Sequence, residues 1–406
     1  MAVAAPTDVS DGSAARADVR RALVVSSGAH ALHDGYTDLI TVLLPVWQAE
    51  FGLAYAAVGL LRTIYSGTMA ALQIPSSILA ERIGGAGVLA VGTALAGACF
   101  CIAGASAGFP WLVAALLIGG LGASTQHPIG SALVARAFAG PRSLTALGTY
   151  NFAGDIGKMV IPAAASLMLL VMAWRPAAAV LGAIGFAAAA AIFILSPRFP
   201  ATQATPAPMA APDTAEASQG SLRPGFWLLL TIGAIDSATR TGFLVFLPFL
   251  MIAKGASVTT AGLALTLLFV GGAAGKLVCA YLGRWFGVVA TICLTKVLTA
   301  AAMVLLLALP IEAAMVLLPP FGAVLNGASS VTYGSVPDFV VPAGRARAFG
   351  LFYTGTIGAG ALAPTISGLA GDALGIPTAI MIVAAIMLMS LPLAFLLRRA
   401  FARAAA

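Results

Sequence analysis

Val42-Leu43-Leu44-Pro45 recurs 203 positions further along the chain as Val245-Phe246-Leu247-Pro248. Three glycines repeat at the same offset, in the pairs Gly52 and Gly255, Gly59 and Gly262, and Gly84 and Gly287. Prolines and glycines punctuate secondary structure, so their repetition at a constant offset indicates two copies of one structural unit. We therefore expect a chain made of two similar halves.

The composition places both halves in a lipid bilayer. Hydrophobic residues make up 60% of the chain and charged residues 9%, whereas soluble domains have about 45–50% and about 25%. A helix needs about 20 apolar residues to cross the bilayer. Such segments are predicted at 22–47, 55–80, 87–107, 110–135, 143–172, 174–196, 225–252, 257–282, 287–309, 311–336, 346–371 and 376–397.

The twelve segments predict an all-α membrane protein built from two pseudo-symmetric six-helix bundles. The segment between the bundles is rich in Ala, Pro, Thr and Ser, a composition that neither packs nor repeats, so we expect it to be a linker. The predicted organisation is an N-terminal tail (1–21), a first bundle (22–196), a linker (197–224), a second bundle (225–397) and a C-terminal tail (398–406).

The net charge of +7 is explained by the position of the cations along the chain. If both termini lie in the cytoplasm, fourteen of the 21 Lys and Arg residues fall on the cytoplasmic side and only Arg175 and Lys254 fall on the other. This distribution follows the positive-inside rule, so we expect no nucleic-acid partner. The cytoplasmic set is Arg16, Arg20, Arg21, Arg82, Arg136, Arg142, Arg198, Arg223, Arg284, Arg345, Arg347, Arg398, Arg399 and Arg403. We expect a multi-pass protein of a bacterial inner membrane.

Several classes of protein are disfavoured by the absence of sequence signals. The polar first twenty residues do not resemble a signal peptide. The four cysteines fall within predicted spans without ligand spacing, and no His and Asp set has the spacing of a stable metal site. No nucleotide-binding loop and no set of nucleophile, base and orienting residue is present. The sequence therefore predicts no enzyme, no cofactor and no metal site.

The arrangement of six plus six spans, with both termini inside and a long central linker, resembles the major facilitator superfamily over essentially the whole chain. That superfamily carries an acid-Arg-x-Gly loop between spans two and three, which corresponds here to Glu81-Arg82-Ile83-Gly84. The resemblance implies that Glu81, Arg82 and Gly84 belong to a gating loop, although the leading glycine and trailing basic residues of the pattern are missing.

Span five is similar to a glycine pattern found in antiporters of the superfamily. Gly148 and Gly157 have the right spacing, and Pro162 stands at the end of the pattern. With Gly154, these residues are expected to let neighbouring helices approach closely. The pattern favours export.

Two further stretches look like the fosmidomycin-resistance type of exporter. These are the His127-Pro128 pair and Gly154-Asp155-Ile156-Gly157. Asp155 stands where those exporters have a neutral amide, and Lys158 adds a charge. The substrate of that family therefore does not carry over to this chain.

Nine charged residues lie inside the predicted spans. At about 3 kcal/mol each they would cost roughly 25 kcal/mol in lipid, more than the stability of a typical domain, so they must face one another or a water-filled cavity. They are Arg62, Lys158, Arg240, Lys276, Lys296, Asp34, Asp38, Asp155 and Asp236.

The acidic members are candidates for proton coupling, because a poorly hydrated cavity favours the neutral form of a carboxylate. These are Asp34, Asp38, Asp155 and Asp236. Candidates for substrate binding are Lys158, Arg62, Arg240, His127, Asn151, Tyr36, Asn326, Tyr333 and Tyr353.

Simpler pairings compete with these roles. Asp155 and Lys158 are three residues apart, so they are expected to form a pair that is either structural or divided between proton and substrate. Asp236 and Arg240 are four apart and could neutralise each other. Arg62 could neutralise Asp38 or close an outer gate, and the long side chains of Lys276 and Lys296 could reach the helix ends.

The histidines also have two interpretations, as titrating switches or as hydrogen-bonded structural residues. His30 lies one turn before Asp34 on the same helical face, whereas His33 and Asp34 point about 100° apart, so His33 and Asp34 are not both expected to line the cavity. His127 precedes Pro128, which is expected to bend span four and to release a carbonyl group.

The sequence thus predicts a monomeric secondary active transporter, whose partners are a small solute, protons and the bilayer. Five intramembrane cations against four anions favour an anionic or zwitterionic organic solute. Two matched bundles around polar midplane faces favour alternating access. Proton-coupled uptake stays open as an alternative, as does a sensor or assembly factor on the same scaffold.

Overall fold

The computed structural model describes residues 9–138, 142–196, 224–340 and 345–405, and all regular structure within them is helical. The predicted linker (197–224) lies, except for Pro224, outside these residues, as do residues 1–8 of the predicted N-terminal tail. The first half contains α1 (Val9–Phe51), α2 (Tyr55–Ile83), α3 (Gly85–Gly104), α4 (Phe109–Ala123), α5 (Gln126–Ala137), α6 (Arg142–Val171) and α7 (Trp174–Leu195). The second half contains α8 (Pro224–Ala253), α9 (Val258–Phe286), α10 (Val288–Ala308), α11 (Ile311–Gly334), the short 3-10 helix η3 (Val336–Phe339), α12 (Arg345–Leu374), α13 (Ile376–Leu388) and α14 (Ser390–Ala405).

The helices make twelve passes through the bundle, because α4 with α5 and α13 with α14 are each one pass with a short interruption. The predicted fold class is confirmed. Within the described residues nine passes are apolar enough to span a membrane on hydropathy alone, and α1, α2 and α12 are not among them. Helices α1 and α2 carry buried charged residues, Asp34, Asp38 and Arg62, which lower their hydropathy. Helix α1 also begins at Val9, before the predicted span.

The repeated glycines have the same structural role in both halves. Gly52 and Gly255 follow the first helix of each half with φ of +61° and +96°, and Gly84 and Gly287 separate the second and third helices with φ of +101° and +83°. Residues with side chains rarely adopt this left-handed region. The duplication predicted from the sequence is therefore confirmed in the turns.

The two halves meet mainly at one end of the molecule. We call this end, where α1 finishes and α2 begins, the distal side, and the end where α1 begins and α14 finishes the terminal side. At the distal side the backbone N–H groups of Tyr55 and Ala56, at the start of α2, donate to the Asp372 carboxylate of α12, both over 2.8 Å. Asp372 thereby satisfies exposed donors of a helix in the opposite half.

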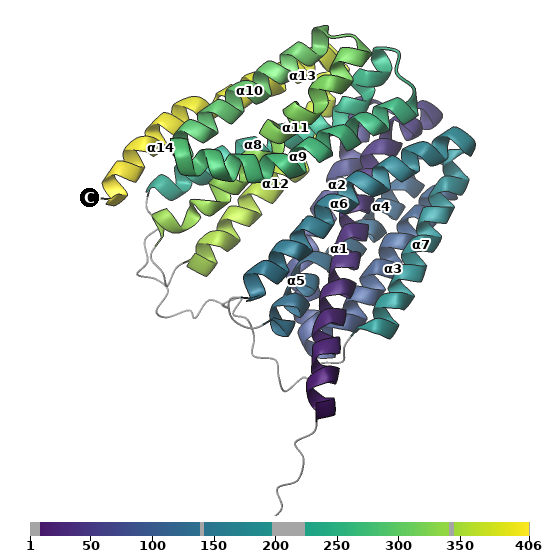
Figure 1. Ribbon diagram of the computed structural model, residues 1–406. Helices are drawn as coiled ribbons and strands as arrows, with labels where there is room; N and C mark the ends of the chain where they lie inside the picture. Colours follow the sequence, from purple (N-terminus) through teal and green to yellow (C-terminus); the bar gives the residue numbers. More distant parts are fainter. Residues whose placement is uncertain (1–8, 139–141, 197–223, 341–344, 406) are drawn as a thin grey trace, which may run out of the picture.

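Helices α2 and α12 continue this contact toward the midplane. The Thr63 hydroxyl donates to the Ala361 carbonyl over 2.7 Å and also lies 2.8 Å from the Thr365 hydroxyl. Gly59 packs directly on the Pro364 backbone, where a Cβ atom would not fit. In Figure 1 the two groups of helices accordingly lie closest at the distal side, and their ribbons diverge toward the terminal side.

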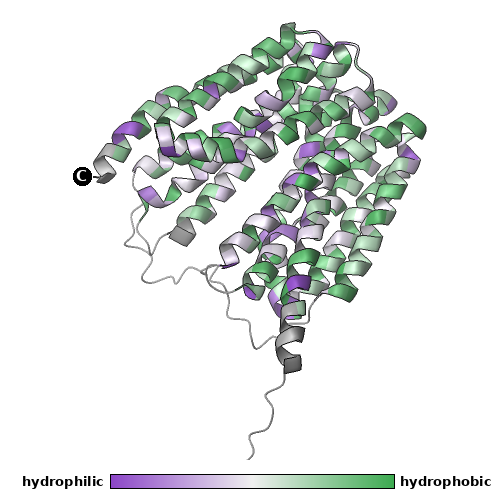
Figure 2. Cartoon of the chain, viewed as in Figure 1, coloured by the Kyte–Doolittle hydropathy of each residue, from purple (hydrophilic) through white to green (hydrophobic). Residues whose placement is uncertain are grey.

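The hydropathy of the surface fits a bilayer. Large apolar side chains point outward, including Val171, Trp285 and Val316, which are 80%, 73% and 76% exposed. In Figure 2 outer helices such as α7 and α10 are mostly hydrophobic, and hydrophilic residues gather on the helices between the halves. The chain is a multi-pass membrane protein with its polar residues turned inward.

Candidate functional site

The Asp34 carboxylate on α1 is surrounded by three basic side chains. Its Oδ2 atom lies 3.2 Å from His30 Nε2 and 3.2 Å from Lys158 Nζ, and its Oδ1 atom lies 3.6 Å from His127 Nε2. Only 9% of the Asp34 side chain is exposed, compared with 44% for His127 and 32% for Lys158. The cluster is thus buried at the carboxylate and open on one side.

Three helices bring these groups together. His30 and Asp34 are one turn apart on α1. His127 lies at the start of α5, just after the interruption at residues 124–125, which follows because Pro128 cannot donate to the carbonyl four residues earlier. Lys158 comes from α6, which packs so closely on α1 that a Cβ at Gly157 would overlap the Ala31 backbone.

The orientation of His30 is fixed by a contact behind the cluster. Its Nδ1 atom lies 2.9 Å from the Tyr150 carbonyl oxygen of α6. The Tyr150 hydroxyl in turn accepts a hydrogen bond from Gln126 Nε2 over 2.8 Å. His33 faces the other way, with Nε2 2.9 Å from the Thr93 hydroxyl of α3. The prediction that His33 and Asp34 do not share one environment is confirmed.

A second polar cluster joins α1 and α2. Arg62 Nη2 lies 3.8 Å from Asp38 Oδ1, and Arg62 Nη1 donates to the Thr37 carbonyl over 2.6 Å. The Thr37 hydroxyl lies 3.1 Å from the Tyr65 hydroxyl. Of the two roles expected for Arg62, the pairing supports neutralisation of Asp38, and the role in an outer gate stays a prediction.

One ion pair connects the two halves near the midplane. Lys276 Nζ of α9 donates to both carboxylate oxygens of Asp155 of α6, over 2.6 and 2.7 Å. The predicted pair of Asp155 with Lys158 is wrong, as is the prediction that Lys276 reaches toward the helix end. Residues three apart on a helix differ in direction by about 60°, which allows Asp155 to face α9 while Lys158 faces α1.

The second half contains its own buried pair. Lys296 of α10 donates to the Asp236 carboxylate of α8, and the side chains are 1% and 6% exposed. Two predictions are therefore wrong: Asp236 does not pair with Arg240, and Lys296 does not extend to the helix end. A buried ammonium group needs a carboxylate at close range, and α8 supplies it.

Arg240 is half-buried on α8, and within the described ranges no hydrogen bond or ion pair is found for its guanidinium. The Tyr333 hydroxyl lies 3.1 Å from the Thr356 hydroxyl, and the Tyr333 ring packs on the half-exposed ring of Tyr353 at 4.8 Å between centroids. These residues form the polar side of the second half.

Three residues predicted for the site or for helix packing lie elsewhere. Tyr36 is buried within the first half and donates to the Leu181 carbonyl of α7. Asn326 donates to the carbonyl of Gly322 on its own helix over 3.3 Å and packs against α9. Gly148 has no neighbour within 4 Å of the position of a Cβ, so it is not at a helix contact. Each prediction was based on depth or spacing and not on the direction of the residue.

The remaining predicted residues lie on the helices and in the turn where the sequence places them. Asn151 is exposed on α6, one turn from Asp155. Glu81 and Arg82 end α2 and are exposed, and Gly84 makes the turn to α3. Pro162 lies inside α6, and its carbonyl accepts a hydrogen bond of 2.7 Å from Ser166. The gating role of the Glu81 loop stays a prediction.

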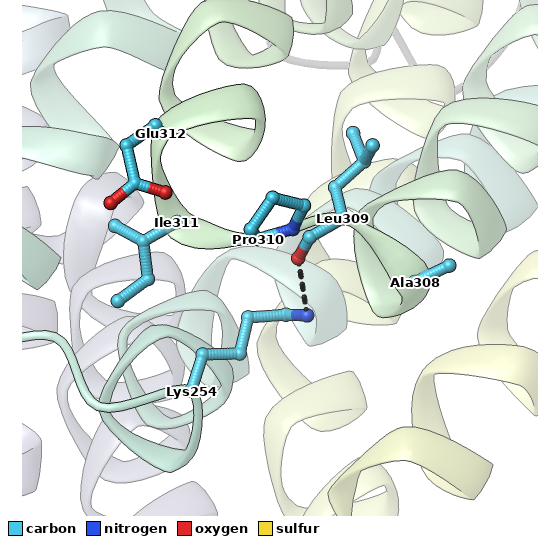
Figure 3. A pocket seen from close by; sticks show the side chains of 6 residues that line it. All are labelled: Lys254, Ala308, Leu309, Pro310, Ile311 and Glu312. Atoms are coloured by element: carbon cyan, nitrogen blue, oxygen red, sulfur yellow. Dashed lines mark hydrogen bonds between the residues drawn. The ribbon is translucent and has the colours of Figure 1, made fainter.

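A surface pocket on the distal side does not belong to the charged site. Its lining residues are Lys254, Ala308, Leu309, Pro310, Ile311 and Glu312 (Figure 3). The Lys254 ammonium donates to the Leu307 and Leu309 carbonyls, both over 2.8 Å, at the end of α10. Lys254 therefore caps a helix and closes a turn.

Sequence reasoning did not identify Tyr150 or Lys276 as parts of the site, nor Asp372 as a contact between the two halves. Lys276 was visible as a charge inside a span, but its partner lies in the other half. Tyr150 contributes a backbone carbonyl, which has no sequence signal. Asp372 lies at a helix end, where an acidic residue usually faces water.

The comparisons with known proteins concern the fold and the family of the chain. No curated protein sequence matches the chain. Among solved structures, a bacterial homolog of the human lysosomal transporter Spinster, inward-facing and unoccupied, superposes with a TM-score of 0.78 at 17% identity and covers 95% of this chain and 98% of its own. The nucleoside transporter NupG (D323A mutant) gives 0.77 at 14% identity, with 93% and 99% covered. The human organic anion transporter MFSD10 (TETRAN) gives 0.63 at 16% identity, with 93% and 99% covered.

At these identities the solved structures establish the fold alone. The family assignment comes from the sequence model of the Major Facilitator Superfamily, which matches twice, over residues 27–235 and 229–405. Each match corresponds to one half of the duplicated chain, and together they cover nearly all of it. The chain therefore belongs to the major facilitator superfamily, as a membrane transporter of small solutes and not an enzyme.

Proposed function

We propose that this protein exports a small organic solute, zwitterionic in preference to purely anionic, in exchange for protons, by alternating access between its two halves. One observation carries the proposal: the ion pair between Asp155 and Lys276 joins the halves near the midplane. A contact of this kind must break when the halves separate at that level. The strength of the ion pair therefore controls whether the transporter favours opening to one side of the membrane or to the other.

Protonation of Asp155 changes the strength of this ion pair. A neutral carboxylic acid no longer attracts the Lys276 ammonium, so proton binding favours the state in which the pair is broken. Reversing a two-state equilibrium from 1:99 to 99:1 takes about 5.5 kcal/mol. The Lys276 side chain is 40% exposed, so its pair is worth less than the 3–5 kcal/mol of a buried pair. Solute binding must supply the remainder.

Half-buried cations in both halves indicate the class of solute. Lys158 and Arg240 are half-buried cations that can receive an anionic group. Exchange requires that proton and solute exclude each other, and a zwitterion whose cationic group contacts Asp155 fulfils this condition. A purely anionic solute that takes the place of Asp155 beside Lys276 binds together with the proton, and this arrangement corresponds to uptake.

The sequence supports the proposed direction of transport and orientation in the membrane. The glycine pattern of α6 favours exchange, and Gly157 allows the backbone contact between α6 and α1 on which Lys158 depends. The distribution of Lys and Arg favours cytoplasmic termini in a bacterial inner membrane. In this orientation the distal side faces outward and is closed. We propose that the monomer is the functional unit.

A transport screen in proteoliposomes tests the function. Metabolites and drugs are offered to the full chain at two proton gradients of opposite sign. We expect one class of solute to move against the proton flow, and movement with it would establish uptake instead. With that solute, Asp155→Asn is expected to abolish solute-driven proton flux, and the matched variant Asp338→Asn, which removes an exposed carboxylate of η3, should retain it. Unchanged coupling in Asp155→Asn would remove this residue from the mechanism.

A further inference from the structure

Three potential metal ligands meet at the Asp34 cluster. The ring nitrogens of His30 and His127 and a carboxylate oxygen of Asp34 all lie within 4.8 Å of one another. His127 lies on a different helix and far along the chain from the other two, so the sequence has no ligand spacing at this site. The expectation of no metal site was based on spacing and therefore did not account for this arrangement.

The hydrogen bond between His30 and the Tyr150 carbonyl determines which ring nitrogen of His30 carries the hydrogen and which one has a free lone pair. The Tyr150 carbonyl can only accept a hydrogen bond, so the His30 Nδ1 atom, 2.9 Å away, carries the hydrogen. In a neutral ring the Nε2 atom then has no hydrogen. It points its lone pair at Asp34 Oδ2 over 3.2 Å, and a carboxylate oxygen is an acceptor as well. Two facing acceptors at this distance require either a proton or a metal ion between them.

The two separations between the histidine nitrogens and the Asp34 oxygens suit a divalent transition-metal ion. Zinc binds imidazole nitrogen at about 2.0–2.1 Å and carboxylate oxygen at about 2.0–2.2 Å in tetrahedral sites, which places two ligand atoms about 3.3–3.5 Å apart. The observed separations are 3.2 Å from His30 and 3.6 Å from His127 to the two Asp34 oxygens. Two imidazoles with one carboxylate form a donor set typical of first-row transition metals.

We propose that His30, Asp34 and His127 form a binding site for a divalent transition-metal ion of the zinc type. The Tyr150 carbonyl orients the His30 ring from behind, as partners of metal-bound histidines commonly do. Gly154 leaves room beside the ligands, because a Cβ there would lie 2.7 Å from both Asp34 Oδ2 and His30 Nε2. Three protein ligands leave a position open on the exposed side of His127 for water or solute.

Lys158 makes metal binding reversible. Its ammonium lies 3.2 Å from the same Asp34 oxygen that faces His30, so it competes with the ion for that oxygen. The side chain is 32% exposed and can move aside when the ion enters. An ion held against such a competitor exchanges more readily than one in a closed structural site.

Calorimetric titration of the purified full chain with Zn²⁺ tests the proposal. The protein carries a purification tag without histidine and is first treated with a chelator. We expect one Zn²⁺ per chain, and His30→Ala and His127→Ala should each weaken binding at least about tenfold. His33→Ala is the matched control, because His33 lies on the same helix but faces Thr93, and it should bind as the unaltered chain does. Lys158→Ala should bind several-fold more tightly.

A second measurement does not depend on any variant. Co²⁺ added to the unaltered chain should give the visible absorption of a nitrogen- and oxygen-ligated tetrahedral or five-coordinate ion, and Zn²⁺ should displace it. Absence of both signals would mean that a proton alone satisfies His30 and Asp34, and the proposal would be overturned. Equal losses in His33→Ala and His127→Ala, with thermal unfolding unchanged, would also overturn it.

Discussion

Asp34 and Asp236 both lie on the first helix of a half, but at the repeat offset of 203 residues Asp236 corresponds to His33, the neighbour of Asp34, and the surroundings of the two carboxylates differ. Asp236 has a single partner, Lys296, and both side chains are closed off from solvent. Asp34 has three basic neighbours, and two of them, His127 and Lys158, are partly exposed. The duplicated scaffold therefore holds one closed carboxylate and one open carboxylate.

The difference in exposure indicates a structural role for the closed pair and an exchange of binding partners for the open cluster. A closed pair with one cation for one anion is complete, so it can stabilise the packing of α8 on α10 but has nothing to exchange. An open cluster with surplus basic groups can change partners, because a proton, an ion or a solute can enter from the exposed side. The open cluster lies in the first half and the closed pair in the second.

The largest expected effect on stability comes from a variant that breaks the closed pair of Asp236 and Lys296. Asp236→Asn leaves the Lys296 ammonium buried without a carboxylate, which should lower the free energy of unfolding by about 3–5 kcal/mol. Asp34→Asn should cost less than about 2 kcal/mol, because Lys158 can turn toward solvent. Thermal unfolding of both variants in detergent measures the difference.

The double variant Asp236→Asn with Lys296→Met is the control. It removes both charges, and replacing a buried ion pair by neutral groups is often nearly neutral, so most of the lost stability should return. Equal destabilisation by Asp34→Asn and Asp236→Asn would contradict the distinction between an open and a closed carboxylate.

A smaller effect is expected from a variant of the open Asp34 cluster. Lys158→Ala should weaken binding of the transported anion or zwitterion by about 1.5–3 kcal/mol, the value of a hydrogen bond to a charged group. A neutral analogue should bind unchanged, and thermal stability should hardly alter because Lys158 is partly exposed. Binding is measured with the solute identified in the transport screen. A similar loss for the neutral analogue would show that Lys158 holds the helices and not the solute.

The sequence was sufficient for the architecture. Composition, span length and the repeated glycines are local properties, and a glycine needed for a left-handed turn is needed in both copies, as at Gly84 and Gly287. The periodicity of a helix also placed His30 beside Asp34 on one face. These predictions succeeded because they depend on one helix at a time.

Pairings between helices could not be predicted in the same way. The partner of Lys276 depends on how α9 docks on α6, and that of Lys296 on how α10 packs on α8. Sequence spacing suggested neighbours on the same helix instead, namely Lys158 for Asp155 and Arg240 for Asp236. An ion pair in a helical bundle is decided by the rotation of each helix, and a few tens of degrees are enough to exchange partners.

The smallest expected effects distinguish two glycines of α6 and show how tightly the open site is packed. A Cβ at Gly154 would lie 2.7 Å from Asp34 Oδ2 and from His30 Nε2, and these atoms end side chains that can shift, so Gly154→Ala should lower stability by only about 1 kcal/mol. Gly148 has nothing within 4 Å, so Gly148→Ala should raise stability by about 0.5–1 kcal/mol through helix propensity. Thermal unfolding compares the two. If Gly154→Ala were stabilising as well, α6 would not press on the Asp34 cluster, and the cluster would be open on two sides and not on one.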